Sequence, residues 1–149
     1  MKIVVSACLL GENCKYNGGN NLCPPVVAYA EGKEVIPVCP ERLAGLGIPR
    51  TPIEIVDGVV RDKQGNSVDA ALREAVEKIL AQLENQEIAC VILKSRSPTC
   101  GVKQVYDGTF SGTLVDGMGV LAEALQKKGY RVLDAEDFIT NGVNPSQKE

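Results

Sequence analysis

Histidine is absent from this chain of 149 residues. Its absence excludes serine–histidine and cysteine–histidine hydrolases, and it leaves proton transfer to carboxylate, hydroxyl, thiol or amine groups. Aromatic residues are scarce, with no tryptophan, four tyrosines and two phenylalanines, so we expect no stacking platform for single-stranded nucleic acid. The 16 basic and 19 acidic residues give a net charge of −3, which offers no basic stripe for a nucleic-acid polymer.

Long apolar segments are also missing. No run approaches the ~20 apolar residues that a membrane-spanning helix needs, so we expect no membrane partner. The apolar start of the chain is followed by Gly11-Glu12-Asn13 without a small-x-small cleavage site, and it is better interpreted as a strand than as a signal peptide. We therefore predict a cytoplasmic protein, in which grouped cysteines more often bind metal or take part in catalysis than form disulfides.

Strand patterns alternate with helix patterns along the chain. We expect strands over residues 2–6, 34–38, 88–93 and 131–133, helices over 26–31, 68–84 and 118–128, a helical turn over 40–47 and a loop over 102–112. The Asp57-Gly58 pair predicts a hairpin with a type I′ turn over 53–60. The fold class is therefore α/β: one three-layer, Rossmann-like domain over residues 1–149, with a small, mostly parallel sheet and an inserted hairpin. We expect an ordered core to about residue 138 and a flexible tail beyond it.

Three of the six cysteines come after predicted strands. Cys8 follows the first strand, Cys39 follows the second, and Cys100 lies a few residues past the third. Because parallel strands end at one edge of a sheet, and ligands bind there, these three thiols should converge. They are our candidate metal ligands. Cys14, on a loop rich in glycine and asparagine, is either a fourth ligand or a nearby thiol.

Two further cysteines have simpler interpretations. Cys90 lies inside the strand 88–93 and is predicted to pack as a small apolar side chain. It also begins a Cys-x5-Arg match that ends at Arg96, but a strand cannot wrap its amides round a phosphate, so we reject a phosphatase loop. Cys23 precedes Pro24-Pro25 at a helix start and is interpreted as a partly buried loop thiol.

The residues alone leave the kind of centre open. A structural zinc site usually contains a Cys-x2–4-Cys knuckle, and none is present. The closely spaced cysteines of ferredoxins are missing too. An iron–sulfur cluster held by three thiolates would leave one iron open to a substrate, as an active site requires. Unrelated loop cysteines, a zinc-stabilised structural domain and a non-catalytic metal or sulfur carrier remain alternatives.

Four segments together resemble one known family, the thiouracil desulfidases, over about residues 3–133. The segments are Ser6–Gly11 with Cys14–Gly18, Val38–Glu41, Gly45–Glu54 and Lys94–Gly101. The resemblance implies a [4Fe–4S] cluster on Cys8, Cys39 and Cys100. It also implies removal of sulfur, as sulfide and without net redox change, from a thiolated pyrimidine such as thiouracil.

The same resemblance assigns roles to residues beside the cysteines. Glu41 and Ser97 match the family's acid/base glutamate and serine, and they are our predicted catalytic residues. Arg50 and Arg96 are predicted to orient the substrate or to counter the negative charge of the cluster. We expect a small thiolated nucleobase as the ligand and cluster-assembly machinery as a partner. Because an open iron is exposed to oxidants, air should empty the site.

Overall fold

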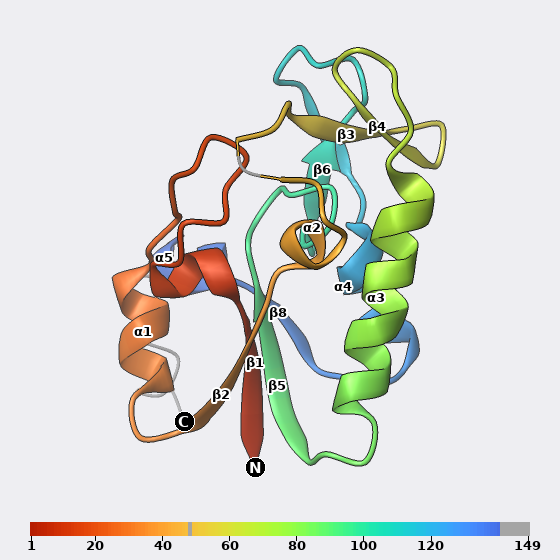
Figure 1. The fold of residues 1–149 in the computed structure, drawn as a ribbon. Helices are drawn as coiled ribbons and strands as arrows, with labels where there is room; N and C mark the ends of the chain where they lie inside the picture. Colours follow the sequence, from red (N-terminus) through yellow and green to blue (C-terminus); the bar gives the residue numbers. More distant parts are fainter. Residues whose placement is uncertain (48, 141–149) are drawn as a thin grey trace.

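A four-stranded parallel sheet forms the centre of the computed structural model, which describes residues 1–47 and 49–140 (Figure 1). Its strands, in spatial order, are β2 (Glu34–Val38), β1 (Lys2–Ser6), β5 (Ile88–Leu93) and β8 (Val132–Asp134). All neighbouring strands in it pair in parallel, which confirms the predicted sheet. The tail that we predict to be flexible, residues 141–149, lies outside the described residues.

The chain changes direction across the sheet at β1. From β1 it passes to β2 on one side, and it later returns to β5 on the other side of β1. In open α/β sheets, such a switch point opens a crevice beyond the carboxyl ends of the strands. The register pairs Ser6 with Val38, so β1 and β2 end level with each other. The loops that follow these strands therefore begin at one place.

One face of the sheet is covered by α1 (Pro24–Ala30) and α5 (Glu136–Thr140). Alternate residues of the central strands point to this side and are almost fully buried: Ile3, Val5, Cys90 and Ile92. Cys90 therefore packs in the core, as predicted. Cys23 packs there as well. It lies in the loop just before α1, as predicted, but at 4% exposure it is fully rather than partly buried.

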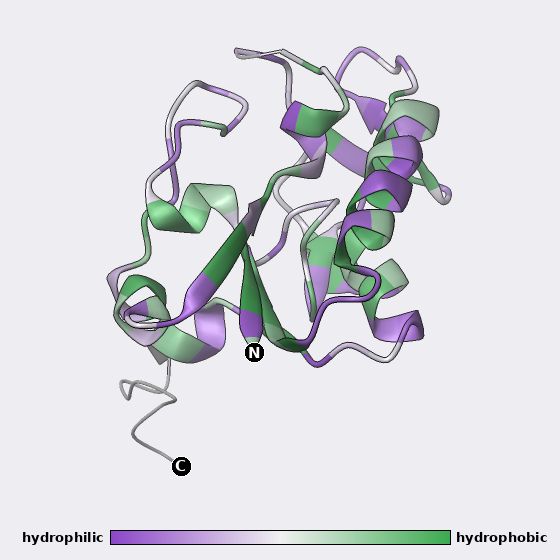
Figure 2. Ribbon diagram, turned by 60° about the horizontal axis from the view of Figure 1, so that its bottom comes forward, coloured by the Kyte–Doolittle hydropathy of each residue, from purple (hydrophilic) through white to green (hydrophobic). Residues whose placement is uncertain are grey.

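The opposite face is covered by α3 (Asp69–Leu83) and α4 (Val120–Lys127). Val4, Val91 and Leu93, which alternate with the residues of the first face, meet the apolar sides of these helices. The sheet is thus apolar on both sides, and Figure 2 shows its strands mostly green beneath helices with purple outer faces. This arrangement is the predicted three-layer order. No helix among the described residues is long and apolar enough to cross a membrane.

Two antiparallel hairpins lie beyond the carboxyl end of the sheet (Figure 1). The first joins β3 (Ile53–Val56) to β4 (Val59–Asp62), and both Asp57 and Gly58 have positive φ, as the predicted type I′ turn requires. The second joins β6 (Gln104–Tyr106) to β7 (Leu114–Asp116). The prediction of a loop over 102–112 was therefore wrong for residues 104–106, which form β6, and correct for the tip that follows them. These strands have three residues each, which is too short for a clear alternating pattern.

Short helical segments complete the carboxyl edge. The 3₁₀ helix η1 (Ala7–Leu10), which the sequence did not indicate, follows β1 directly. The helix α2 (Pro40–Leu43) follows β2 and is shorter than the turn predicted over 40–47. The N-terminus of α4 packs against the segment 99–101, because the amides of Gly119 and Leu121 bond the carbonyls of Gly101 and Thr99 at 2.7 and 2.8 Å.

Gly119→Ala tests this close approach. A Cβ at position 119 would lie 2.4 Å from the carbonyl carbon of Thr99 and 2.7 Å from the amide nitrogen of Cys100. Because backbone must move to relieve the clash, we expect the free energy of unfolding to fall by about 1–3 kcal/mol in urea denaturation. Gly117→Ala is the matched control, since its Cβ would meet only a Val105 methyl group, at 3.3 Å. Equal stability of the two variants would contradict the prediction.

Candidate functional site

A cavity of 530 Å³ opens at the carboxyl ends of β1, β2 and β5. Its volume lies within the range of about 300–1,000 Å³ that is typical of small-molecule sites. Cys8 reaches it from η1, Cys39 from the junction of β2 and α2, and Cys100 from the loop after β5. The structure therefore brings together the three cysteines that the topology predicted to converge. Cys14 lines the same cavity from the loop that follows η1.

The four thiols influence one another electrostatically. Burial raises the pKa of Cys100 to about 12, and burial together with the neighbouring Cys39 raises the pKa of Cys14 to about 12. Burial also raises the pKa of Cys8, and charge on Cys39 adds to the rise. For Cys8, Cys14 and Cys100, the thiolate would thus be costly to form beside the neighbouring thiols. A positively charged group bound between these buried thiols would stabilise the thiolates and so offset the cost of forming them.

Ser6 supports the cysteines from the end of β1, and sequence reasoning did not single it out for this role. Its buried hydroxyl accepts the amide N–H of Lys94 at 3.0 Å and hydrogen-bonds the Cys100 side chain, which lowers the pKa of that thiol against the effect of burial. The Lys94 ammonium also lies near Cys8 and lowers the pKa of that thiol. Both residues favour negative charge on sulfur.

Glu41, in the first turn of α2, also lines the cavity. Its Oε1 lies 3.2 Å from a guanidinium nitrogen of Arg50. The Arg50 side chain is only 7% exposed, and it also donates to the carbonyls of Cys14 and Gly47 at 3.0 and 2.9 Å. Arg50 therefore joins the carboxylate to the loop that contains Cys14. In such a buried position, the fixed guanidinium defines where the carboxylate points.

The hydroxyl of Ser97 organises the chain that leads to Cys100. It accepts the amide N–H groups of Thr99 and Cys100 at 3.1 and 3.2 Å, and the carbonyl of Ser97 accepts the amide of Gly101 at 2.8 Å. Ser97 lines the cavity as well. The predicted catalytic serine thus lies three residues before a predicted ligand, in a turn that it shapes itself.

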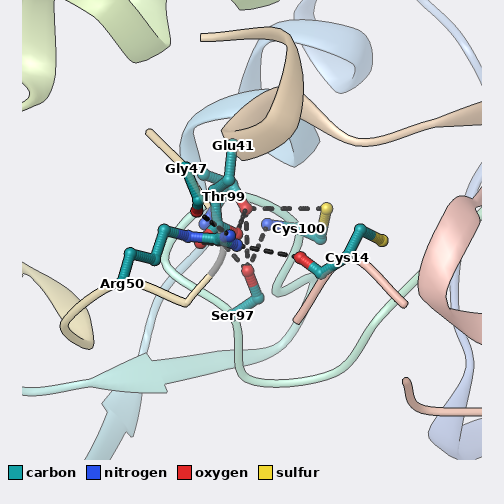
Figure 3. A network of polar contacts seen from close by, with 7 residues as sticks. All are labelled: Cys14, Glu41, Gly47, Arg50, Ser97, Thr99 and Cys100. Carbon is teal, nitrogen blue, oxygen red and sulfur yellow. Dashed lines mark hydrogen bonds and ion pairs between the residues drawn. The ribbon is translucent and has the colours of Figure 1, made fainter. Parts of the chain in front are cut away.

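Thr99 connects Ser97 to Glu41, as Figure 3 shows. Its hydroxyl is 3.1 Å from Oε2 of Glu41 and 2.8 Å from the Ser97 hydroxyl, and the residue is 0% exposed. An ionised carboxylate can only accept, so Thr99 donates to Glu41. Ser97 must then donate to Thr99. With Glu41 as a carboxylate, the hydroxyl hydrogens therefore run from Ser97 through Thr99 to Glu41, and the Thr99 hydroxyl also lies 3.7 Å from Sγ of Cys100. Sequence reasoning missed Thr99, the residue in the middle.

The two predicted substrate-binding arginines differ in their surroundings. Arg50 is buried inside the network, where it holds Glu41. Arg96 also lines the cavity, but its side chain is 42% exposed and pairs with Glu136 of α5 at 2.8 Å. In both, the Nε atom is buried and has no hydrogen-bond partner within the described part of the chain. Each guanidinium group is therefore paired with a carboxylate, and its Nε–H group has no hydrogen-bond partner among the described residues.

The thiols do not form a site for one metal ion. Among residues 1–47 and 49–140, no group of three or more cysteine or carboxylate side chains is compact enough to hold a single ion. A structural zinc ion would need four ligands around one point, with Zn–S distances of about 2.3 Å.

These features define an α/β protein with a small-molecule cavity of thiols at its switch point. The model of the 2-thiouracil desulfurase family matches residues 3–137, and the chain belongs to this family. The family is the one that the sequence segments resemble.

Two individual proteins show how far the likeness extends. A solved structure described as the [4Fe–4S]-dependent thiouracil desulfidase TudS has a TM-score of 0.84, with 32% sequence identity over 91% of each chain. The uncharacterized protein YbbK of Bacillus subtilis (strain 168) is 36% identical over 146 residues, which cover 91% of this chain and 97% of YbbK.

Thr99→Val tests the hydroxyl chain. Valine has nearly the same shape but leaves the Ser97 hydroxyl and Oε2 of Glu41 without their partner, which costs about 1–3 kcal/mol for a buried group. We expect a fall of this size in the free energy of unfolding, measured by urea denaturation. Thr99→Ser keeps the hydroxyl and should lose less than half as much. If the valine variant is as stable as the wild type, the chain of donors is not formed.

Proposed function

We propose that this protein removes sulfur from a thiolated pyrimidine such as thiouracil, by hydrolysis and without net redox change. Water supplies the oxygen that replaces sulfur on the ring, and the sulfur leaves as sulfide. Family membership supports this class of reaction. The observation that carries the proposal is the Glu41 carboxylate, which is held between Arg50 and Thr99 at the wall of a cavity that four cysteines line.

The cysteines fit the cluster named for TudS. Cys8, Cys39 and Cys100 would hold a [4Fe–4S] cluster, because thiolates are its usual ligands and all three line one cavity. When bound, such a cluster supplies a Lewis-acidic iron with an open position, suited to a thiocarbonyl sulfur. Lys94 and the Ser6 hydroxyl favour the thiolate forms of the ligands. Cys14 then remains a neighbouring thiol.

Glu41 handles the protons in this scheme. Its carboxylate accepts a proton from the water molecule that attacks the thiocarbonyl carbon, and it returns the proton as the C–S bond breaks. The carboxyl group ends as it began, so a thiocarbonyl and water give a carbonyl and hydrogen sulfide. Arg50 holds Oε1 and Thr99 holds Oε2, which fixes the carboxylate relative to the cavity. In a chain without histidine, a carboxylate is the expected group for this task.

Hydrogen bonds connect Glu41 through Thr99 to Ser97, which gives the carboxylate a second route for proton transfer. While Glu41 is a carboxylate, the donors run from Ser97 to Thr99 to Glu41. Once Glu41 has taken a proton from water, the direction reverses: the carboxyl group donates to Thr99, Thr99 donates to Ser97, and the Ser97 hydrogen is free to be donated to a ligand. Glu41 and Ser97 both line the cavity and Thr99 does not, so Ser97 is the hydroxyl group of this network that can contact a ligand. We infer that it donates a proton to the substrate as charge develops there.

A carrier of metal or sulfur is the competing function. It needs the thiols, but it does not need an oriented carboxylate, a buried guanidinium and two aligned hydroxyl groups beside them. The network around Glu41 therefore favours an enzyme. Buried polar networks of this kind are costly to maintain unless every member is satisfied.

Glu41→Gln should lower the rate of sulfide release by about 10²-fold or more, because an amide cannot take a proton from water. The measurement uses protein loaded with iron and sulfide under anaerobic conditions and incubated with 2-thiouracil. Sulfide and uracil are quantified together, and the wild type should form them in equal amounts without added reductant.

Glu34→Gln is the matched control, since this carboxylate on β2 has a side chain that is 74% exposed and lies outside the cavity lining. Its rate should equal that of the wild type. A Glu41→Gln variant with an unchanged rate would remove Glu41 from the mechanism. Cluster-loaded wild type that turns over neither 2-thiouracil nor 4-thiouracil would favour the carrier.

Alanine substitutions of the cysteines should separate ligands from neighbours. We expect Cys8→Ala, Cys39→Ala and Cys100→Ala each to lose most of the iron and acid-labile sulfide after anaerobic loading. Cys14→Ala should keep the iron content and the visible absorption of the wild type. The measurement is elemental analysis together with the absorption spectrum.

Circular dichroism provides the control for folding of each cysteine variant. If Cys14→Ala lost as much iron as the other three, the centre would have four thiolates and no open iron. That result would contradict the proposed binding of a substrate sulfur.

A further inference from the structure

Half of the aromatic side chains gather at the cavity, although the chain has only six. Three belong to the hydrophobic cores, namely Tyr29, Tyr130 and Phe138. The other three line the cavity, namely Tyr16, Tyr106 and Phe110. None of these three residues is a proposed ligand of the cluster or a proposed proton-transfer group, and none belongs to a hydrophobic core described above. Their place at the cavity therefore calls for a role in ligand binding.

Two of them, Tyr106 and Phe110, come from the β6–β7 hairpin. Tyr106 ends β6 and is paired with Leu114 of β7, and Phe110 lies at the tip, residues 107–113. The tip is internally ordered, because the Asp107 carboxylate accepts both the amide and the hydroxyl of Thr109 at 2.9 and 2.6 Å. Phe110 is thus presented by a loop with a defined shape.

A buried carboxylate holds this tip against the neighbouring hairpin. Glu54 of β3 is 7% exposed, and its Oε1 accepts the amide N–H groups of Gly108 and Phe110 at 2.9 and 3.2 Å. A Cβ at position 108 would lie 2.6 Å from the carbonyl oxygen of Ile55, so the tip rests directly on β3. Charge-assisted bonds to backbone amides are strong and directional.

The backbone at Phe110 is held in an unfavourable region. Its φ of +56° is left-handed, which a bulky aromatic residue rarely adopts. Such a conformation persists only where surrounding contacts enforce it, and residues of this kind are concentrated at ligand-binding sites. Here the contact that enforces it is the bond from the Phe110 amide to Glu54.

The cavity therefore has two chemically different walls. One wall, from the ends of β1, β2 and β5, contains the cysteines, Glu41 and Ser97. The other, from the two hairpins, contains Tyr106 and Phe110 together with Ile53, Glu54 and Lys63 (Figure 1 shows the two hairpins together). We infer that Phe110, assisted by Tyr106, binds the face of a planar heteroaromatic ring and so selects thiolated bases over thioamides without a ring. Glu54 is its positioning residue.

This inference rests on the proposed function for its substrate, so the test uses binding as well as turnover. Phe110→Leu removes the aromatic face and keeps an apolar side chain of similar size. We expect it to raise the dissociation constants of both 2-thiouracil and uracil by about tenfold, since stacking on an aromatic side chain contributes this order of affinity per base. The measurement is isothermal titration calorimetry with anaerobic, cluster-loaded protein.

Thiourea and a second variant provide the controls. Thiourea has the same N–C(=S)–N group as 2-thiouracil but no ring, so Phe110→Leu should change its inhibition constant by less than about twofold. Val115→Ala, on β7 and 44% exposed, lies in the same hairpin but does not line the cavity. It should leave all three constants unchanged.

The role of Glu54 has its own test. Glu54→Ala should weaken binding of uracil and 2-thiouracil to the same extent as Phe110→Leu, and it should speed hydrogen exchange at the amides of Gly108 and Phe110. Glu54→Gln keeps an oxygen that accepts both amides, so it should restore binding and slow exchange. If Glu54→Ala only lowered the overall stability of the protein, Glu54→Gln would not slow hydrogen exchange selectively at these two amides.

The outcomes separate this inference from the proposed function. If the wild type releases sulfide from 2-thiouracil but Phe110→Leu keeps wild-type dissociation constants, ring binding by Phe110 is refuted and the proposed function is supported. If the wild type binds uracil through Phe110 but releases no sulfide from thiolated pyrimidines, the proposed function is refuted and the inference of ring binding by Phe110 is supported. If the wild type binds neither uracil nor 2-thiouracil, the inference that Phe110 binds a heteroaromatic ring is itself refuted.

Discussion

The parallel pairing of β1 between β2 and β5 is the constraint on which the rest of the structure depends. Cys8, Cys39 and Cys100 are far apart in sequence, and each is placed by the end of a different strand. Backbone hydrogen bonds fix the register of these strands, and apolar side chains cover both faces of the sheet. The thiols are therefore brought together by the core, without any ligand. A site built in this way is largely formed before a cluster or a substrate arrives.

The sequence predicted those parts of the molecule that depend on local pattern and topology. The four sheet strands, the long helix and the type I′ hairpin were recognisable from apolar periodicity and an Asp-Gly pair. Convergence of the three cysteines followed from strand order, and Glu41 and Ser97 followed from family resemblance. The structure places both at the cavity, while their catalytic roles stay predictions.

Other features depend on contacts between distant segments, and no local signal indicates them. Thr99 matters because its hydroxyl meets a carboxylate 58 positions away. Glu54 looks like an ordinary strand residue until the hairpin tip folds onto it and donates two amides. The β6–β7 hairpin itself was missed, because three-residue strands among glycines give no alternation to detect. Such features require the tertiary structure.

The lining of the cavity comes from two separately anchored parts of the chain. The cysteines, Glu41 and Ser97 lie on segments that the central sheet anchors, whereas Phe110 lies on a hairpin tip that a single carboxylate fastens. None of these anchored residues belongs to the tip. The part of the cavity lining that comes from the hairpin is therefore separate in the chain from the part that comes from the central sheet, and a change confined to the tip leaves the positions of the cysteines, Glu41 and Ser97 unaltered.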